Sequence, residues 1–400
     1  MKALALVWLA LVVVACGNSS GPGAQAASVT GIAGDSQVAP TGAALAFPLS
    51  LVTLGSNGQP VQGVNVTWSV TPSNGATFAP SASPSDVNGV ASTNVTLGGT
   101  VADLVITATV PGISPVLFHE RAIDPCTYLT AYTLGQTVNA SLAATDCNRA
   151  SLGWYYDYYG LDVPSAQQSV RISMSSTLFD SYLDLWSAAG PYVGFDDDIV
   201  PGLQQNSQLD VILPTGSYVI GANSYDKFST GAYSITATAR PAAMNGCREV
   251  WVARGITASD SITPTDCADS TAGTPHNYDV ARMVVYGVTV LSIASRSAAI
   301  NPSLALYRYN PAAPAATRRT LVASNDDSLP GTNTNAFIAY TVSDTAFYDI
   351  IIGSSAPGER GPYTFEVYAS TTMSARRSEP APGRREWWLS AGAPLKPSKL

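Results

Sequence analysis

Two acidic runs follow similar stretches of the chain. Residues 179–186 (FDSYLDLW) and 300–307 (INPSLALY) carry apolar side chains at alternate positions and lie 121 residues apart. The run DDD follows the first stretch at 196–198, and NDD follows the second at 325–327. Calcium prefers six to eight carboxylate and carbonyl oxygens at about 2.3–2.6 Å. If each strand and its acidic loop are neighbours, we expect the acids of the first copy to converge on a calcium site.

The candidate calcium ligands are Asp180, Asp196, Asp197 and Asp198 in the first copy and Asp326 and Asp327 in the second. Asn301 and Ala305 stand where the first copy has Asp180 and Asp184, so fewer carboxylates are available in the second copy. Neither run follows the spacing of an EF-hand loop. The alternative is a solvated turn, in which Asp side chains accept hydrogen bonds from nearby backbone N–H groups. No cofactor is required by any other feature of the sequence.

A tyrosine-rich segment is the second candidate binding feature. It contains Tyr155, Tyr156, Tyr158 and Tyr159. Successive side chains of a strand point to opposite faces, so two tyrosines would lie on each face. An exposed pair could stack on a sugar ring or on peptide. The alternative is that one pair belongs to the core and the other packs across strands.

The residue types needed for covalent catalysis are sparse. The two histidines, His119 and His276, belong to no H-E-x-x-H motif. Residues 17–21 (GNSSG) match the G-x-S-x-G pattern, but that pattern works at a strand-to-helix turn, and here it lies in a Gly/Ser-rich linker. A pair such as Asp180 and Asp197 would suit glycoside hydrolysis only at a separation that sequence does not give. We therefore do not expect an enzyme.

The N-terminus is typical of an exported protein. Lys2 precedes 13 apolar residues, 3–15. As a helix they would extend about 20 Å, which is too short for a bilayer core of about 30 Å, so we predict a signal peptide over residues 1–15. Residues 13–16 (VVAC) resemble the lipobox of bacterial lipoproteins. This resemblance implies a diacylated Cys16, a membrane anchor and a flexible tether over 16–27.

Gly17 stands where inner-membrane lipoproteins commonly carry Asp. The resemblance therefore implies an outer-membrane or cell-surface location. The other four cysteines form two pairs at similar spacing, Cys126 with Cys147 and Cys247 with Cys267. An exported protein meets oxidising conditions, so we predict two disulfides, each worth about 3 kcal/mol in the chain-entropy model. A zinc cluster is disfavoured because the four thiols are divided between two modules.

Composition favours an all-β protein. Charged residues make up 12% of the chain and apolar residues 46%, with short β-branched and aromatic runs between turn residues. Residues 371–400 carry six Lys or Arg against two Glu, so the remainder is more acidic than the overall net charge of −8. This balance argues against nucleic acid as a partner. Lacking any period, residues 371–400 are predicted to be disordered.

Residues 28–122 carry the motifs of a first module. A turn at 57–61 (NGQPV) precedes a strand in which Val64, Val66, Trp68 and Val70 alternate with polar residues. With the turn at 86–89 (DVNG), these motifs resemble the bacterial Ig-like domain of the invasin and intimin type. The resemblance implies a sandwich that serves as a spacer, with Trp68 in its core.

Residues 124–240 and 246–370 form a duplicated module. The motifs at 157–159 (DYY), 179–183 (FDSYL), 196–198 (DDD) and 231–233 (GAY) resemble the bacterial pre-peptidase C-terminal domain. The second copy departs from the pattern at Val280 and Ala281. The resemblance implies a β-sandwich, here jelly-roll-like, that aids substrate or matrix binding and in some members binds calcium.

The sequence thus predicts an all-β protein of three tandem sandwiches behind a signal peptide and tether. The function it favours is a non-enzymatic, lipid-anchored surface protein that binds an extracellular polysaccharide or protein matrix. The alternatives are a structural or accessory protein for a secreted peptidase, or a hydrolase of matrix polymers.

Overall fold

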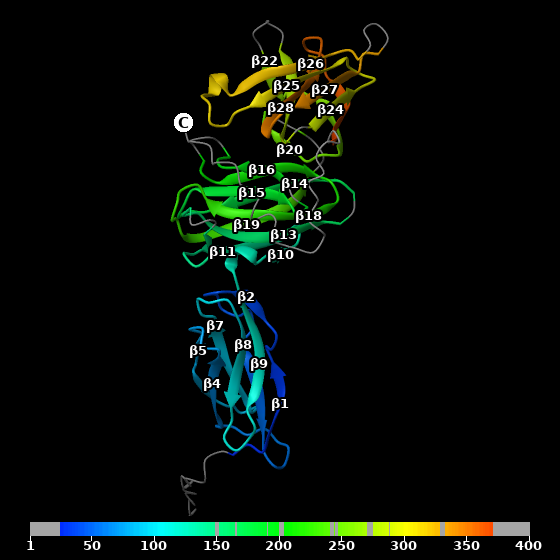
Figure 1. The fold of residues 1–400 in the computed structure, drawn as a ribbon. Coiled ribbons are helices and arrows are strands. Elements are labelled where there is room, and N and C mark those ends of the chain that lie inside the picture. The colour runs from blue at the N-terminus through cyan, green and yellow to red at the C-terminus, as the bar shows by residue number, and fades with distance from the viewer. Residues whose placement is uncertain are drawn as a thin grey trace, which may run out of the picture. The chain divides into compact units, whose positions relative to one another are not determined.

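The computed structural model describes residues 25–148, 152–164, 166–189, 191–199, 204–240, 244, 247–269, 275–287, 289–328 and 333–370. It comprises two compact units, Met1–Ile123 and Asp124–Leu400 (Figure 1). The predicted signal peptide, Cys16, most of the predicted tether and the predicted tail 371–400 lie outside the described residues. No helix in the described ranges is long and apolar enough to cross a bilayer.

The first unit is a two-sheet sandwich. Its sheets have the strand orders β1-β3-β7-β5 and β2-β9-β8-β4-β6. The strands are β1 (Ser28–Ala33), β2 (Val38–Pro40), β3 (Leu49–Leu54), β4 (Asn65–Thr71), β5 (Thr77–Ala79), β6 (Ala82–Pro84), β7 (Val90–Thr96), β8 (Ala102–Thr109) and β9 (Val116–Ile123). Alternation along β4 buries Val66 and Trp68 between the sheets. The Trp68 ring lies 5.8 Å from that of Phe118, and its Nε1 donates to Ser83 Oγ at 2.9 Å, as expected for a core residue.

The first copy in the second unit packs two sheets over one core. They contain β10 (Thr130–Tyr132), β11 (Thr137–Leu142), β12 (Cys147–Asn148), β13 (Tyr155–Val163), β14 (Gln168–Ser175), β15 (Ser181–Ser187), β16 (Tyr192–Asp196), β17 (Ser207–Leu213), β18 (Gly216–Ser224) and β19 (Gly231–Arg240). One sheet has the order β10-β13-β18-β15-β16, and the other begins β11-β19-β14-β17. A 3₁₀ helix, η1 (Pro125–Thr127), precedes them.

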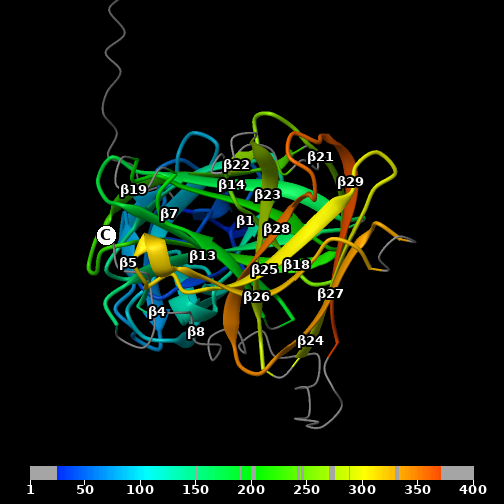
Figure 2. The same ribbon diagram turned by 90° about the horizontal axis from the view of Figure 1, so that it is seen from above.

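The second copy repeats this arrangement. Its elements are β20 (Val250–Val252), β21 (Ile256–Ile262), β22 (Cys267–Asp269), β23 (His276–Val285), β24 (Thr289–Arg296), β25 (Pro302–Tyr309), η3 (Ala315–Thr317), β26 (Arg319–Asn325), β27 (Ala336–Val342), β28 (Ala346–Ser354) and β29 (Gly361–Ser370). The order β21-β29-β24-β27 forms one sheet. In Figure 2, β23, β28, β25 and β26 lie next to one another in the other sheet. The prediction of tandem all-β sandwiches is confirmed.

Both predicted disulfides are formed. Cys126 pairs with Cys147 and Cys247 with Cys267, at Cα–Cα distances of 4.5 and 4.3 Å. Each bond connects the segment that enters a copy to the short strand beside its long β13 or β23 strand. The two disulfides therefore occupy equivalent places in the repeat.

The two copies share one continuous ten-stranded sheet, which the sequence did not predict. β20 pairs in parallel with β17 on one side, opposite Val211 and Ile212, and with β23 on the other. Parallel strands exchange evenly spaced backbone hydrogen bonds. The two sandwiches are thereby joined through backbone pairing as well as by the connecting chain.

Trp251 of β20 contributes to the core of the first copy, although it belongs to the second. It is 2% exposed, and its ring lies 5.2 Å from Phe195 and 5.9 Å from Phe347. Gly194 in β16 provides the space for it, because a Cβ at that position would lie 2.5 Å from Trp251 Cδ2. Carbon atoms do not approach so closely, so the indole depends on glycine here.

We therefore predict that Gly194→Ala destabilises the second unit by about 1–3 kcal/mol, the usual cost of overpacking a core. Gly160→Ala in β13 is the matched control, since a Cβ there meets nothing within 4 Å. Urea denaturation measures both effects. Equal midpoints for the two variants would show that Trp251 does not fill this space.

Candidate metal centre

A β-hairpin brings three of the predicted acids to the same end of the first copy. β15 and β16 are antiparallel, with Leu183 opposite Asp196. Asp180 directly precedes β15, and Asp197 and Asp198 directly follow β16. Because the start of one antiparallel strand lies beside the end of its partner, residues far apart in sequence meet here.

Each of Asp180, Asp197 and Asp198 offers a carboxylate oxygen, and these oxygens all lie within 4.8 Å of one another. Asp180 is only 6% exposed, and the other two are partly buried. Like charges this close raise one another's energy unless protons or a cation compensate. Carboxylate oxygens are the ligands that calcium prefers, so the donor set fits a hard divalent cation.

Asp196 does not join this cluster, and its assignment as a ligand is corrected. Its carboxylate accepts hydrogen bonds from the Gln208 backbone N–H and from Arg248 Nη2, both at 2.7 Å. Successive side chains of a strand alternate in direction, so Asp196 is turned away from its neighbour Asp197. Since Arg248 precedes β20, Asp196 instead forms an ion pair at the junction of the two copies.

Asp184 likewise belongs to the protein interior. It is 2% exposed and accepts from the Tyr192 hydroxyl at 2.6 Å and from Asn223 Nδ2 at 3.2 Å. These bonds link β15 to β16 and β18. Asp184 therefore holds neighbouring strands together and is not a metal ligand in this arrangement.

The second copy repeats the hairpin with fewer acids. Leu304 of β25 lies opposite Asn325 of β26, the same register as in the first copy, so Asn301 corresponds to Asp180 and Asp327 to Asp198. The Oδ1 atoms of Asn301 and Asp327 are buried without a hydrogen-bond partner. Asp326 is exposed. Among the described residues, three acids converge in the first copy alone.

The structure leaves no exposed pair in the tyrosine segment, so the predicted stacking platform is wrong. Tyr156, Tyr158 and Tyr159 are 3–5% exposed, and Tyr155 is half-buried. Tyr156 stacks on Tyr158 at 5.4 Å, and Tyr158 packs edge-on against Trp186. Tyr156, Tyr158 and Tyr159 all belong to the same buried hydrophobic cluster, so both faces of β13 are covered. The packing alternative holds.

Buried carboxyl–tyrosine pairs recur in the two copies. The Tyr233 hydroxyl donates to Asp157 Oδ2 at 2.6 Å, and the Tyr363 hydroxyl donates to Asp279 Oδ2 at 2.8 Å. Burial raises the pKa of Asp157 to about 6 and that of Asp279 to about 8, and the tyrosine hydrogen bonds only partly oppose this. Both carboxyl groups are therefore stabilised in the protonated form.

This repeated pair predicts a pH-dependent stability. A carboxyl group with a raised folded-state pKa contributes stability below its unfolded pKa and loses it as pH rises through the folded value. For Asp279, the free energy of unfolding should fall between about pH 4 and about pH 8, the unfolded and folded pKa values of this group. Asp279→Asn should flatten this dependence, because the amide oxygen can still accept from Tyr363 and never ionises.

Differential scanning calorimetry across this pH range measures the effect. The exposed residue Asp326 supplies the control variant, Asp326→Asn, which should keep the wild-type slope. An unchanged slope in Asp279→Asn would contradict the assignment of this group.

Comparisons with known proteins give only distant likenesses. No protein-family model matches the sequence, and no curated protein does. The pre-peptidase C-terminal domain of a Bacillus anthracis collagenase is 16% identical, covers 28% of this chain and 95% of its own, and has a TM-score of 0.23. The intimin D0–D1 domains are 11% identical over 53% of this chain and 96% of theirs, with a TM-score of 0.21. Invasin is 14% identical over 81% of this chain and 54% of its own, with a TM-score of 0.20.

These neighbours include both domain types that the motifs resemble. Their TM-scores are too low to carry an argument about function.

Proposed function

We propose that this protein is a lipid-anchored surface protein whose duplicated sandwiches form a calcium-dependent, non-catalytic binding head. The observation that supports this best is the convergence of Asp180, Asp197 and Asp198 at the end of one hairpin. Asn301 and Asp327 occupy equivalent positions in the second copy, and their Oδ1 atoms are buried without a hydrogen-bond partner. These atoms support the view that this end of the hairpin is adapted to a cation coordinated by side-chain oxygens.

The remaining parts have roles in this proposal that follow from their sequence. The lipid on Cys16 is the membrane partner, residues 17–27 are the tether, and the Ig-like sandwich is the spacer. An extracellular polysaccharide or protein matrix is the partner of the head. The charge balance of the chain disfavours nucleic acid.

Calcium should bind the full chain saturably and raise the melting temperature of the second unit. A ligand that binds only the folded state at 100 times its Kd stabilises it by about 2.7 kcal/mol. The double variant Asp197→Asn/Asp198→Asn should abolish both the binding heat and the stabilisation, while Asp326→Asn retains them. Calorimetric titration and thermal unfolding measure the two responses. Equal calcium responses in wild type and double variant would remove the metal from the proposal.

Lipid anchoring is tested separately. In the native host, Cys16→Ser should move the protein from the membrane fraction to the soluble fraction, because the acylated thiol is lost. Detergent partition and mass spectrometry of the N-terminal peptide measure this change. Continued membrane association of the variant, or an unmodified wild-type Cys16, would contradict the anchor.

A further inference from the structure

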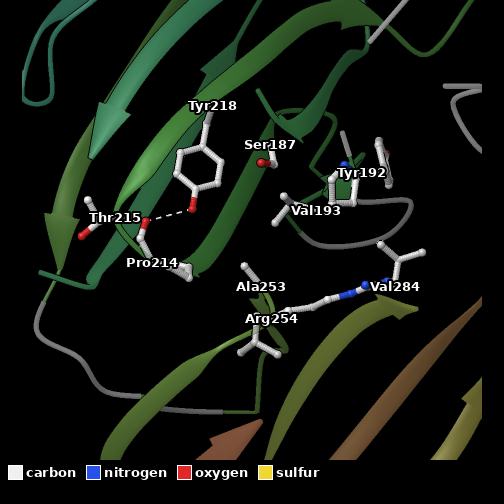
Figure 3. A pocket seen from close by; sticks show the side chains of 11 residues that line it. Ser187, Tyr192, Val193, Pro214, Thr215, Tyr218, Ala253, Arg254 and Val284 are labelled. Carbon is white, nitrogen blue, oxygen red and sulfur yellow. Dashed lines mark hydrogen bonds between the residues drawn. The ribbon is translucent and has the colours of Figure 1, made fainter. Parts of the chain in front are cut away.

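A pocket of about 220 Å³ opens where the two copies meet (Figure 3). Its wall from the first copy contains Pro191, Tyr192, Val193, Pro214 and Tyr218, and its wall from the second contains Val252, Ala253, Arg254 and Val284. The volume lies below the range of about 300–1,000 Å³ typical of drug-sized ligands, so it suits a single residue-sized group. Apart from Arg254, the lining is mostly apolar.

Arg254 differs from the other arginines that the structure describes. Each of the others forms an ion pair with a carboxylate or donates to an amide or a backbone carbonyl, as Arg248 does to Asp196 and Arg282 to Asp349. No ion pair or hydrogen bond holds Arg254 within the described residues, and its Nη2 is buried without a partner. Its closest charge-stabilising contact is the Tyr286 ring, at 6.0 Å from the guanidinium carbon.

Among the residues that the structure describes, no anion compensates the charge on Arg254. Burial lowers the pKa of its guanidinium below the usual value. The same environment raises the pKa of Tyr286 to about 12, so this phenol is neutral and cannot serve as the counter-ion. The Arg254 side chain is partly buried, and a cation partly removed from water without an anion or a full set of acceptors carries a cost. An anionic group entering the pocket would relieve this cost.

Two other polar groups of the lining are already engaged. The Tyr218 hydroxyl donates to the Pro214 carbonyl at 2.8 Å, and Ser187 Oγ accepts from the Ala189 N–H at 3.2 Å. In Figure 3 the guanidinium end of Arg254 points away from Pro214 and Thr215 and towards the side where Tyr192 and Val284 lie. The pocket thus combines one fork of donors with aliphatic and aromatic walls. That combination fits a carboxylate attached to an apolar group better than a sugar acid, whose ring hydroxyls would need several polar partners.

We propose that this pocket binds the C-terminal carboxylate and terminal aliphatic side chain of a peptide, with Arg254 pairing with the carboxylate. The guanidinium fork matches a carboxylate with two parallel hydrogen bonds. The apolar walls accept the side chain. This inference deepens the proposed binding function by giving the class of protein ligand, and it does not depend on the metal.

The test mixes the full chain with the peptide acetyl-Gly-Gly-Leu, which has a free carboxylate, and measures binding of the peptide by ligand-observed NMR. The peptide acid should bind, and the same peptide with a C-terminal amide should bind at least tenfold more weakly. Arg254→Gln should lose binding of the acid by at least tenfold, while Arg254→Lys loses less. Arg121→Gln, which removes an exposed arginine of the first unit, should leave binding unchanged.

Stability supplies a second readout. Because Arg254→Gln removes a partly buried charge that has no counter-ion among the described residues, its melting temperature without peptide should equal or exceed that of the wild type. Equal binding of acid and amide, or a markedly less stable Arg254→Gln variant that still binds the acid, would overturn the proposal. Tighter binding of D-galacturonic acid than of the peptide acid would overturn it in favour of an acidic polysaccharide.

Measurements of peptide binding with and without calcium distinguish the pocket from the proposed metal site. Peptide binding should persist in excess chelator, because none of the clustered acids lines the pocket. If the wild type responds to calcium but does not bind the peptide, the proposal for the pocket is wrong and the metal site is unaffected. If the wild type binds the peptide but shows no response to calcium, the proposal for the metal site is wrong and the proposal for the pocket is supported.

Discussion

The parallel pairing of β20 with both copies is the interaction on which the second unit depends. Without β20, β17 would be an edge strand of the first sandwich, and β23 would lose its parallel partner on the side that faces β17. Exposed edges are open to pairing with other chains. The three buried residues Val250–Val252 cover both edges at once and turn two sandwiches into one continuous sheet.

Side chains on either side of β20 reinforce this joint. Trp251 inserts above Gly194, and Arg282 donates to both oxygens of Asp349 at 2.7 and 3.0 Å while stacking 3.7 Å above the Tyr309 ring. The Arg282 guanidinium also holds the pKa of Glu249 below its usual value. Buried charges of this kind contribute little net stability, but removing one partner leaves the other uncompensated, so the Arg282–Glu249 pair keeps the start of β20 beside β23. The pocket around Arg254 is lined by residues of both copies, so it depends on this joint.

Local patterns predicted the parts of this structure that local physics determines. Period-2 alternation gave the strands, as at Trp68, and the cysteine spacing gave both disulfides. The offset between residues 179–186 and 300–307 gave the repeat. The meeting of Asp180 with Asp197 and Asp198 followed once the two strands were taken as neighbours, because an antiparallel hairpin returns the chain to its starting point.

Features that depend on contacts between the copies were not predictable in this way. Asp196 looked like its neighbours in sequence, but its partner, Arg248, lies 52 residues further along the chain. The sequence left open whether one tyrosine pair is exposed, because alternation assigns side chains to the two faces of a strand without saying what covers each face. β20 is too short to show a period, so neither the joint nor Arg254 had a sequence signal.

Amide hydrogen exchange on the full chain tests the central claim most directly. If β20 joins the two sandwiches, the backbone amides of Val250–Val252 should exchange about as slowly as those of the neighbouring strands β17 and β23, because all three would open only with the unit as a whole. Fast exchange of these amides, at the rate of a solvent-exposed loop while β17 and β23 stay protected, would contradict the account.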